Sequence, residues 1–142
     1  MRTFFACILL SLIFACQNQP SGDAASTVQT QLVDSVLIIL NPFDFDTLMM
    51  EKPNIMLFDL RPSSEFAKGH LWRSTNMDAT DSLFYHRMAA LGVSNEFAIY
   101  DFNGTLGLEV AKKMKGYGFK RIYLLQSGII GWGDTGRALQ LN

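Results

Sequence analysis

Short, largely apolar runs that alternate with amphipathic stretches are the feature of this sequence that most restricts its fold. The runs cover residues 36–40 (VLIIL), 54–60 (NIMLFDL), 97–100 (FAIY) and 121–125 (RIYLL). Strands that are apolar along their whole length are typical of a parallel sheet covered on both faces, because both sides of each strand are then buried. The pattern therefore predicts an α/β domain built on a parallel sheet.

The stretches that separate these runs are predicted to be helices, over residues 45–51, 63–68, 81–91 and 106–116. In the two longer ones, apolar residues recur at helical spacing and supply a face for packing on the sheet. A length of 142 residues favours one domain with a modest core. The residues expected on the packed faces are Leu83, Phe84, Met88, Leu91, Leu108, Val110, Ala111 and Met114.

Residues 1–16 (MRTFFACILLSLIFAC) have the organisation of an export signal. One arginine precedes an apolar stretch that is short of the ~20 residues needed to span a bilayer, and a small residue and a cysteine follow. The segment 13–16 (IFAC) resembles a bacterial lipobox. That resemblance implies a lipoprotein signal peptide over residues 1–15 and a diacylglycerol lipid on the sulfur of Cys16. A plain N-terminal anchor and a secretory signal cut elsewhere are the alternatives.

The lipid on Cys16 is expected to be followed by a tether, so that residues 16–31 hold the lipidated cysteine and a flexible polar segment. The folded domain is then residues 32–142. No Asp follows Cys16, which favours the periplasmic side of the outer membrane of a bacterial cell envelope. The expected partners are membrane lipid, through Cys16, and an envelope protein.

Cysteine usage limits the chemistry of the domain. The chain has two cysteines, Cys7 and Cys16, and both lie in the predicted signal and lipidation site. The domain then has no thiol for a disulfide, a metal site or a nucleophile. The two histidines and the scattered acids show no metal-ligand spacing, so we expect no metal and no cofactor. A formal net charge of −1 argues against nucleic acid as a partner, because phosphate binding requires a basic surface.

Two of the predicted strands end in a carboxylate, at Asp59 and Asp101. Ligands of open parallel sheets bind at the carboxyl ends of the strands, so both acids are candidate functional residues. A loop with Gly104 and Gly107 follows Asp101 and leads into a predicted helix. These glycines permit a tight turn with positive φ, and the amides that open the helix form a cradle for negative charge. We therefore expect Asp101 to occupy its own anion site, or simply to cap the helix that follows.

Residues 101–106 (DFNGTL) resemble motif I of the haloacid dehalogenase-like phosphohydrolases, in which DxDGT follows an apolar strand. This resemblance implies that Asp101 is a nucleophile toward phosphorus. Asn103 stands at the position of the second acid, where an amide cannot transfer the proton. Only 41 residues follow Asp101, which leaves little room for the remaining motifs of that family.

A second resemblance covers nearly the whole domain. Residues 57–77 (LFDLRPSSEFAKGHLWRSTNM) resemble the first signature of rhodaneses, 97–107 align with the strand and active-site loop of that family, and 118–132 (GFKRIYLLQSGIIGW) resemble its closing segment. The three stretches occur in the family's order and spacing. The chain is thus similar to a single rhodanese-like domain, which implies a central parallel five-stranded sheet flanked by helices.

In active rhodaneses the residue aligned with Asp101 is a cysteine that carries a persulfide. A carboxylate cannot store sulfane sulfur, because the transfer requires a polarizable thiolate. The resemblance therefore implies an inactive homologue, acting as a non-catalytic binding or structural module. The alternative is a hydrolase that uses Asp101 for phosphoryl transfer or as an acid/base with Asp59. The loop expected to form the recognition surface consists of Asp101, Phe102, Asn103, Gly104, Thr105, Leu106 and Gly107.

Asp59, Arg61, Glu65 and His70 are expected to support this loop. Arg61 and Glu65 are predicted to pair across the turn after residue 59. His70 falls in the family's Gly-His pair, and the resemblance implies that it organises the loop.

Two tryptophans are also conspicuous. Trp72 and Arg73 replace the Pro-Gly that is common at this position of the family. An exposed binding anchor and a packed cover of the core are both open for Trp72. Trp132 matches the family's C-terminal tryptophan and is predicted to lie in the core.

Overall fold

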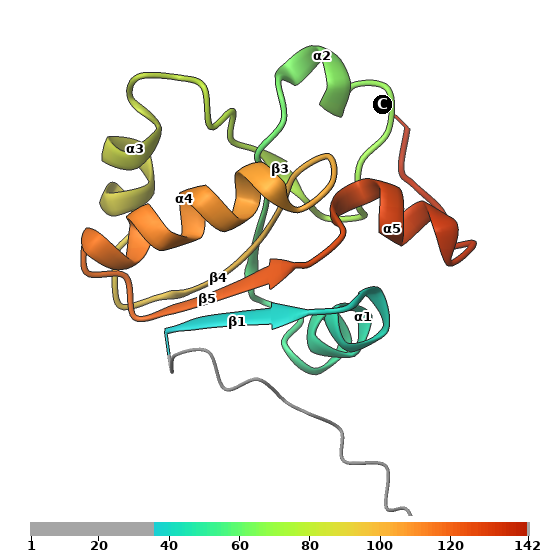
Figure 1. The fold of residues 1–142 in the computed structure, drawn as a ribbon, viewed down its shortest axis with the longest axis horizontal. Coiled ribbons are helices and arrows are strands. Elements are labelled where there is room, and N and C mark those ends of the chain that lie inside the picture. Colours follow the sequence, from blue (N-terminus) through green and yellow to red (C-terminus); the bar gives the residue numbers. More distant parts are fainter. Residues whose placement is uncertain (1–35, 142) are drawn as a thin grey trace, which may run out of the picture. The chain divides into compact units, whose positions relative to one another are not determined.

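The computed structural model describes residues 36–141, in which the strands form one parallel sheet (Figure 1). The predicted signal peptide, Cys16 and the tether lie outside the described residues. The strand order is β1-β5-β4-β2-β3. The predicted fold class, a parallel five-stranded α/β domain, is confirmed. The strands are β1 (Leu37–Leu40), β2 (Met56–Asp59), β3 (Thr75–Asn76), β4 (Glu96–Tyr100) and β5 (Arg121–Leu125).

Helices cover both faces of the sheet (Figure 1). Helices α3 and α4 pack on one face, and α1 and α5 pack on the other. Within residues 36–141, no helix has the length and apolar character that crossing a membrane requires. The helices are α1 (Pro42–Glu51), α2 (Ser63–Phe66), α3 (Phe84–Ala90), α4 (Thr105–Gly116) and α5 (Gly128–Asp134).

The central strand β4 divides its side chains between two hydrophobic clusters. Phe97 and Ile99 point into the cluster shared with α3 and α4, and Ala98 and Tyr100 point into the cluster shared with α1 and α5. Successive side chains of a strand lie on opposite faces, so an apolar strand can serve two cores at once. This explains why the runs are apolar without alternation. Trp132 lies in the second cluster, as predicted.

Two helices begin three residues away from their predicted starts. Helix α1 begins at Pro42 rather than at residue 45, because the Oδ1 of Asn41 caps it by accepting the amides of Phe43 and Asp44, each at 2.9 Å. Helix α3 begins at Phe84 rather than at residue 81. Residues 81–83 form a turn instead, in which the Leu83 amide donates to the Asp81 carboxylate.

Two elements have no counterpart in the predicted pattern. Strand β3 has two residues, too few to produce a recognisable apolar run. Helix α5 contains Gly128, Gly131 and Gly133, residues that weaken any helical signal.

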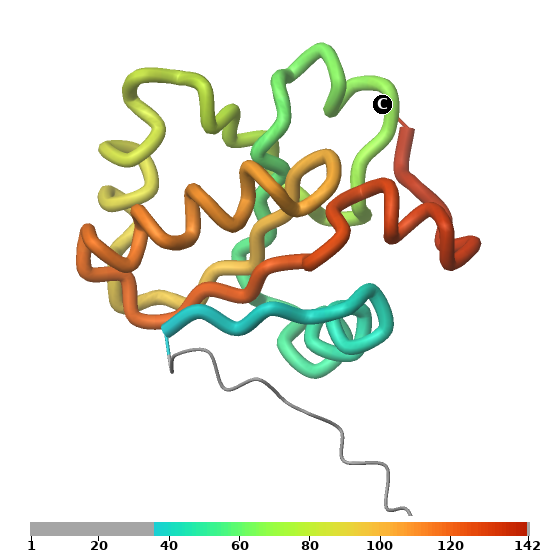
Figure 2. Tube along the Cα trace, viewed as in Figure 1, coloured from blue at the N-terminus to red at the C-terminus, as the bar shows by residue number. Residues whose placement is uncertain are grey.

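The C-terminal segment returns to the segment that follows α2 (Figure 2). The His70 amide donates to the Gln140 carbonyl at 3.0 Å, and the Gln140 amide donates to the His70 carbonyl at 2.8 Å. This isolated antiparallel bridge fixes residues 69–73 against residues 139–141, beside the carboxyl edge of the sheet.

Candidate functional site

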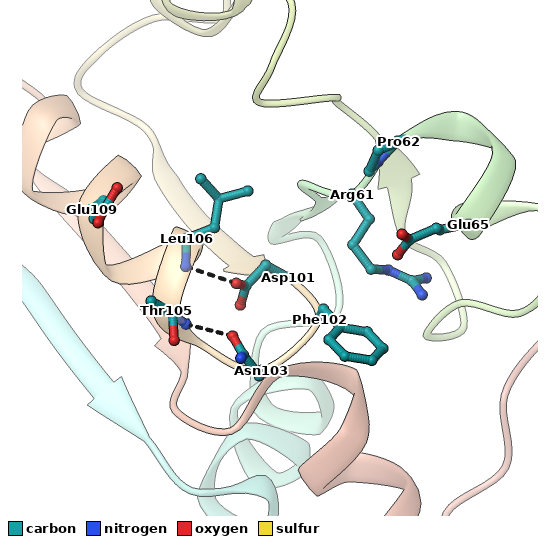
Figure 3. Close-up of a pocket in the computed structure, with 9 residues that line it drawn as sticks. All are labelled: Arg61, Pro62, Glu65, Asp101, Phe102, Asn103, Thr105, Leu106 and Glu109. Carbon is teal, nitrogen blue, oxygen red and sulfur yellow. Dashed lines mark hydrogen bonds between the residues drawn. The ribbon is translucent and has the colours of Figure 1, made fainter.

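Asp101 lies directly after β4, in the loop that leads into α4, and is 2% exposed. Its Oδ1 accepts the Gly104 amide at 2.6 Å. Its Oδ2 accepts the Leu106 amide at 2.9 Å (Figure 3). The amide cradle expected at this junction is therefore present, and the carboxylate of Asp101 fills it.

Gly104 gives the loop its shape. Its φ is 89°, and a Cβ at this position would lie 1.8 Å from the carbonyl oxygen of Gln126, so only glycine fits. Gly107 differs from the prediction, since it lies inside α4 and is not among the residues with positive φ. Its missing side chain instead lets α4 approach the Leu124 side chain, because a Cβ there would lie 2.6 Å from the Leu124 Cδ1.

The first residues of α5 hold the other side of the loop. Gly128 has a φ of 57°, and a Cβ on it would lie 2.6 Å from the Asp101 carbonyl oxygen. This close approach lets the Ile129 amide donate to the Asp101 carbonyl at 2.9 Å and the Ile130 amide donate to the Phe102 carbonyl at 3.2 Å. The loop is thus fixed on both sides by backbone contacts.

Arg61 forms its ion pair with Asp59, which replaces the predicted pairing with Glu65. Both partners are buried, and the Arg61 Nη2 lies 2.6 Å from the Asp59 Oδ2. The same nitrogen donates to the Gly69 carbonyl at 2.7 Å. Burial disfavours the charged guanidinium, but the hydrogen bonds and charge of Asp59 outweigh it and raise the pKa of Arg61.

Tyr100 is a site residue that the sequence pattern did not single out. Its ring is fully buried, and its hydroxyl accepts the Leu71 amide at 3.0 Å and hydrogen-bonds the Ser74 hydroxyl at 2.9 Å. Burial, assisted by the charge of Asp59, raises the pKa of Tyr100, so the hydroxyl stays protonated. The residue before Asp101 therefore ties β4 to the turn at residues 71–74.

Replacing Tyr100 by Phe should lower the free energy of unfolding by about 1–3 kcal/mol, because the buried Leu71 amide loses its acceptor. Urea denaturation of the full chain measures the change. Tyr117→Phe is the matched control, since Tyr117 is largely exposed. Equal effects of the two substitutions would contradict a structural role for the Tyr100 hydroxyl.

An open pocket of about 350 Å³ lies over the loop. Asp101 contributes to its base, and Phe102, 52% exposed, stands at its rim. Glu65 and Glu109 approach from opposite sides of the loop (Figure 3). The structure thus brings most of the predicted site residues together. The predicted residues that line the pocket are Asp101, Phe102, Asn103, Thr105, Leu106, Arg61 and Glu65.

Four of the predicted site residues do not line this pocket. Gly104 and Gly107 shape the loop from behind, and Asp59 lies beneath Arg61. His70 is buried, its ring stacks on Phe66 at a centroid distance of 3.9 Å, and its Nδ1 hydrogen-bonds the Phe66 carbonyl at 3.1 Å. Over residues 36–141, no group of three or more His, Cys, Asp or Glu side chains is placed to hold a metal ion.

For Trp72 the sequence left open an exposed binding anchor or a packed cover of the core. Its side chain is 69% exposed, so it does not cover the core. The guanidinium carbon of Arg73 lies 5.1 Å from the centroid of its ring. The pair therefore forms a surface feature on the turn that Tyr100 holds.

Comparison with solved structures gives several similar folds. A rhodanese-like domain of an Anabaena protein has a TM-score of 0.65 at 17% identity, covering 77% of this chain and 80% of that one. A rhodanese-like domain protein from Staphylococcus aureus has a TM-score of 0.62 at 15% identity, covering 73% and 97%. A polysulfide-sulfur transferase from Wolinella succinogenes has a TM-score of 0.60 at 22% identity, covering 75% and 80%. These likenesses establish the fold.

Comparison with curated protein sequences finds no match. The family model of the rhodanese-like domain matches residues 45–135. The match runs from α1 through the Asp101 loop to the end of α5, and includes every residue that shapes the pocket. The chain therefore belongs to the rhodanese-like domain family.

Proposed function

We propose that this chain is a lipid-anchored rhodanese-like module of a bacterial envelope that lacks sulfurtransferase activity and binds a partner through the Asp101 pocket. The observation that carries the proposal is the carboxylate of Asp101, which accepts the amides of Gly104 and Leu106. In this proposal Asp101 stands where active relatives have their cysteine. The domain has no other thiol to replace it, since the two cysteines of the chain are Cys7 and Cys16.

The pocket suits a positively charged group of the partner. Among residues 36–141, it is lined by the carboxylates of Asp101, Glu65 and Glu109 and by one cation, Arg61. The charge of Arg61 is neutralised by its buried pairing with Asp59. The exposed ring of Phe102 adds a face that attracts cations. An ammonium or guanidinium on a side chain of an envelope protein matches this arrangement. An anion is disfavoured, because Asp101 already takes both amides.

The hydrolase alternative gains no support from the structure or the comparisons. Both oxygens of Asp101 accept backbone amides, and only 2% of the residue is exposed to a substrate. Asp59, the suggested acid/base partner, is paired with Arg61. A nucleophile or base needs an accessible, uncommitted oxygen.

Titration of the full chain with an acetylated tetrapeptide containing one lysine tests the pocket. We expect the amide resonances of Phe102, Gly104 and Leu106 to shift, and a norleucine version of the peptide to leave them unchanged. Glu65→Gln and Glu109→Gln should each weaken binding about threefold to fivefold, because each removes one attractive charge.

Glu51→Gln is the matched control, since this exposed glutamate ends α1, outside the pocket. Equal shifts with the lysine and norleucine peptides would contradict recognition of a cation. So would a Glu51→Gln effect as large as that of Glu65→Gln.

A further inference from the structure

We propose that a second surface, distinct from the pocket, rests on an anionic phospholipid bilayer and orients the domain at the membrane. This Trp72 surface consists of Lys68, Trp72, Arg73, Leu139 and Leu141. The inference rests on the proposed lipid anchor, which holds the domain close to such a bilayer. The chemical groups it would meet are phosphate headgroups and the upper part of the acyl chains.

The turn that presents Trp72 is a β-turn with an unusual residue at its third position. The Ser74 amide donates to the Leu71 carbonyl at 3.0 Å, and Arg73 occupies the third position with a φ of 66°. This left-handed conformation favours glycine, and Arg73 is the one described non-glycine residue that adopts it. An exposed Trp-Arg pair therefore stands where glycine would avoid backbone strain. A turn with a purely structural role does not require this pair.

Apolar side chains flank this turn. Leu141 is 71% exposed and Leu139 is 38% exposed. Both lie against Gly69, since a Cβ there would be 3.6 Å from the Leu141 Cδ2 and 3.4 Å from the Leu139 Cδ1. The bridge between His70 and Gln140 keeps the two segments side by side (Figure 2). The leucines therefore lie beside the segment that leads into the Trp72 turn.

The two segments that form this surface carry charged side chains of one sign only. Residues 66–77 and 136–141 contain no Asp or Glu, although the whole chain has a net charge of −1. Lys68 and Arg73 are exposed there, whereas Arg137 is engaged with Asp46 at 2.9 Å. Long cationic side chains beside an exposed tryptophan are the combination that binds at the interface of anionic membranes. This charge complementarity selects the lipid over a neutral surface.

The anchor leaves enough chain for this orientation. Cys16 is 20 residues before Val36, where the described domain begins, and such a segment reaches at most about 70 Å. A domain of this size has a radius of gyration of only about 13 Å. The Trp72 surface can therefore meet the same bilayer, although β1 begins at the amino edge of the sheet and the turn lies beyond the carboxyl end of β2. Because the anchor raises the local concentration, weak contacts suffice.

Tryptophan quenching by bromine-labelled lipid tests the proposal. The full chain is purified from membranes and placed in vesicles of bromine-labelled phosphatidylglycerol or phosphatidylcholine. We expect quenching in the anionic vesicles only, and its loss in Trp72→Ser, since Trp132 is buried. Arg73→Gly and Lys68→Gln should each lower the ratio of lipid-contacting to free domain about fivefold. Arg73→Gly suits the φ of 66°, so its effect cannot be ascribed to misfolding.

Lys120→Gln is the matched control, because Lys120 is exposed just before β5. Vesicle flotation reports the anchor separately. If the chain floats with both lipids but shows no quenching, only membrane contact by the Trp72 surface is contradicted. A protein would then be the partner of that surface. Flotation with phosphatidylglycerol alone, with quenching, contradicts the anchor and supports the surface. Flotation with neither lipid, or Lys120→Gln acting like Lys68→Gln, contradicts the proposal.

Discussion

Asp101→Cys is expected to acquire one sulfur atom from thiosulfate, whereas the wild-type chain gains none at this position. The thiolate attacks the outer sulfur of thiosulfate, an S–S bond forms on the protein, and sulfite leaves with the electron pair of the broken bond. The amides of Gly104 and Leu106 already point at the side chain of residue 101, so they would meet the thiolate and persulfide as they meet the carboxylate. Such amides at a helix start lower a thiol pKa.

The measurement is mass spectrometry of proteolytic fragments, which separates residue 101 from Cys7 and Cys16. Addition of one sulfur atom to the fragment with residue 101 would show that Asp101 of the wild-type chain is the only block to the chemistry. Absence of the adduct in a folded variant would mean that the cradle does not serve a thiolate. A wild-type chain that turns thiosulfate and cyanide into thiocyanate would contradict the proposed function.

The acidic side chains that line the pocket predict how salt changes the rate of persulfide formation in this variant. Thiosulfate is a dianion, and Glu65 and Glu109 line the way to residue 101. Their repulsion should slow persulfide formation at low salt, and added salt should speed it by screening. Glu65→Gln in the Asp101→Cys background should have the same direction of effect. A rate independent of salt and of Glu65 would argue against an acidic pocket.

The sheet could be predicted from sequence because each long strand is apolar along its length, and β4 shows why. Phe97 and Ile99 serve one core while Ala98 and Tyr100 serve the other. The loop after β4 was also predictable, since a carboxylate at a strand end and a glycine three residues later form a local pattern. Strand β3 was not, because two residues carry no periodicity.

The contacts beneath the loop could not be predicted, since they depend on which buried groups need partners. Arg61 and Glu65 both follow the strand that ends at Asp59, and pairing across the turn was therefore predicted. Asp59, however, is fully buried, and a carboxylate without a countercharge there is costly, so it takes the guanidinium instead. The hydrogen bond of the Tyr100 hydroxyl could not be predicted either. The apolar run indicated only that this residue is buried.

Arg61→Met is expected to lower the free energy of unfolding by about 3–5 kcal/mol. The substitution leaves the carboxylate of Asp59 buried without its cation, and leaves the Gly69 carbonyl without the donor 2.7 Å away. Arg87→Met is the control, since Arg87 pairs with Asp81 at 2.9 Å on the surface, where such pairs contribute about 0–1 kcal/mol. Chemical denaturation of both variants measures the difference.

The double variant Asp59→Asn with Arg61→Met separates the charge from the packing. Asparagine keeps an oxygen for the Arg61 backbone amide, which donates to the Asp59 Oδ1 at 2.9 Å, but removes the unpaired charge. Most of the stability lost in Arg61→Met should therefore return. If the single variant were as mild as Arg87→Met, the pair would not be the support of the pocket. If the double variant recovered none of the lost stability, the loss would come from the Gly69 contact and from packing. Arg61 would then stabilise the domain by packing and by that hydrogen bond, not as a countercharge.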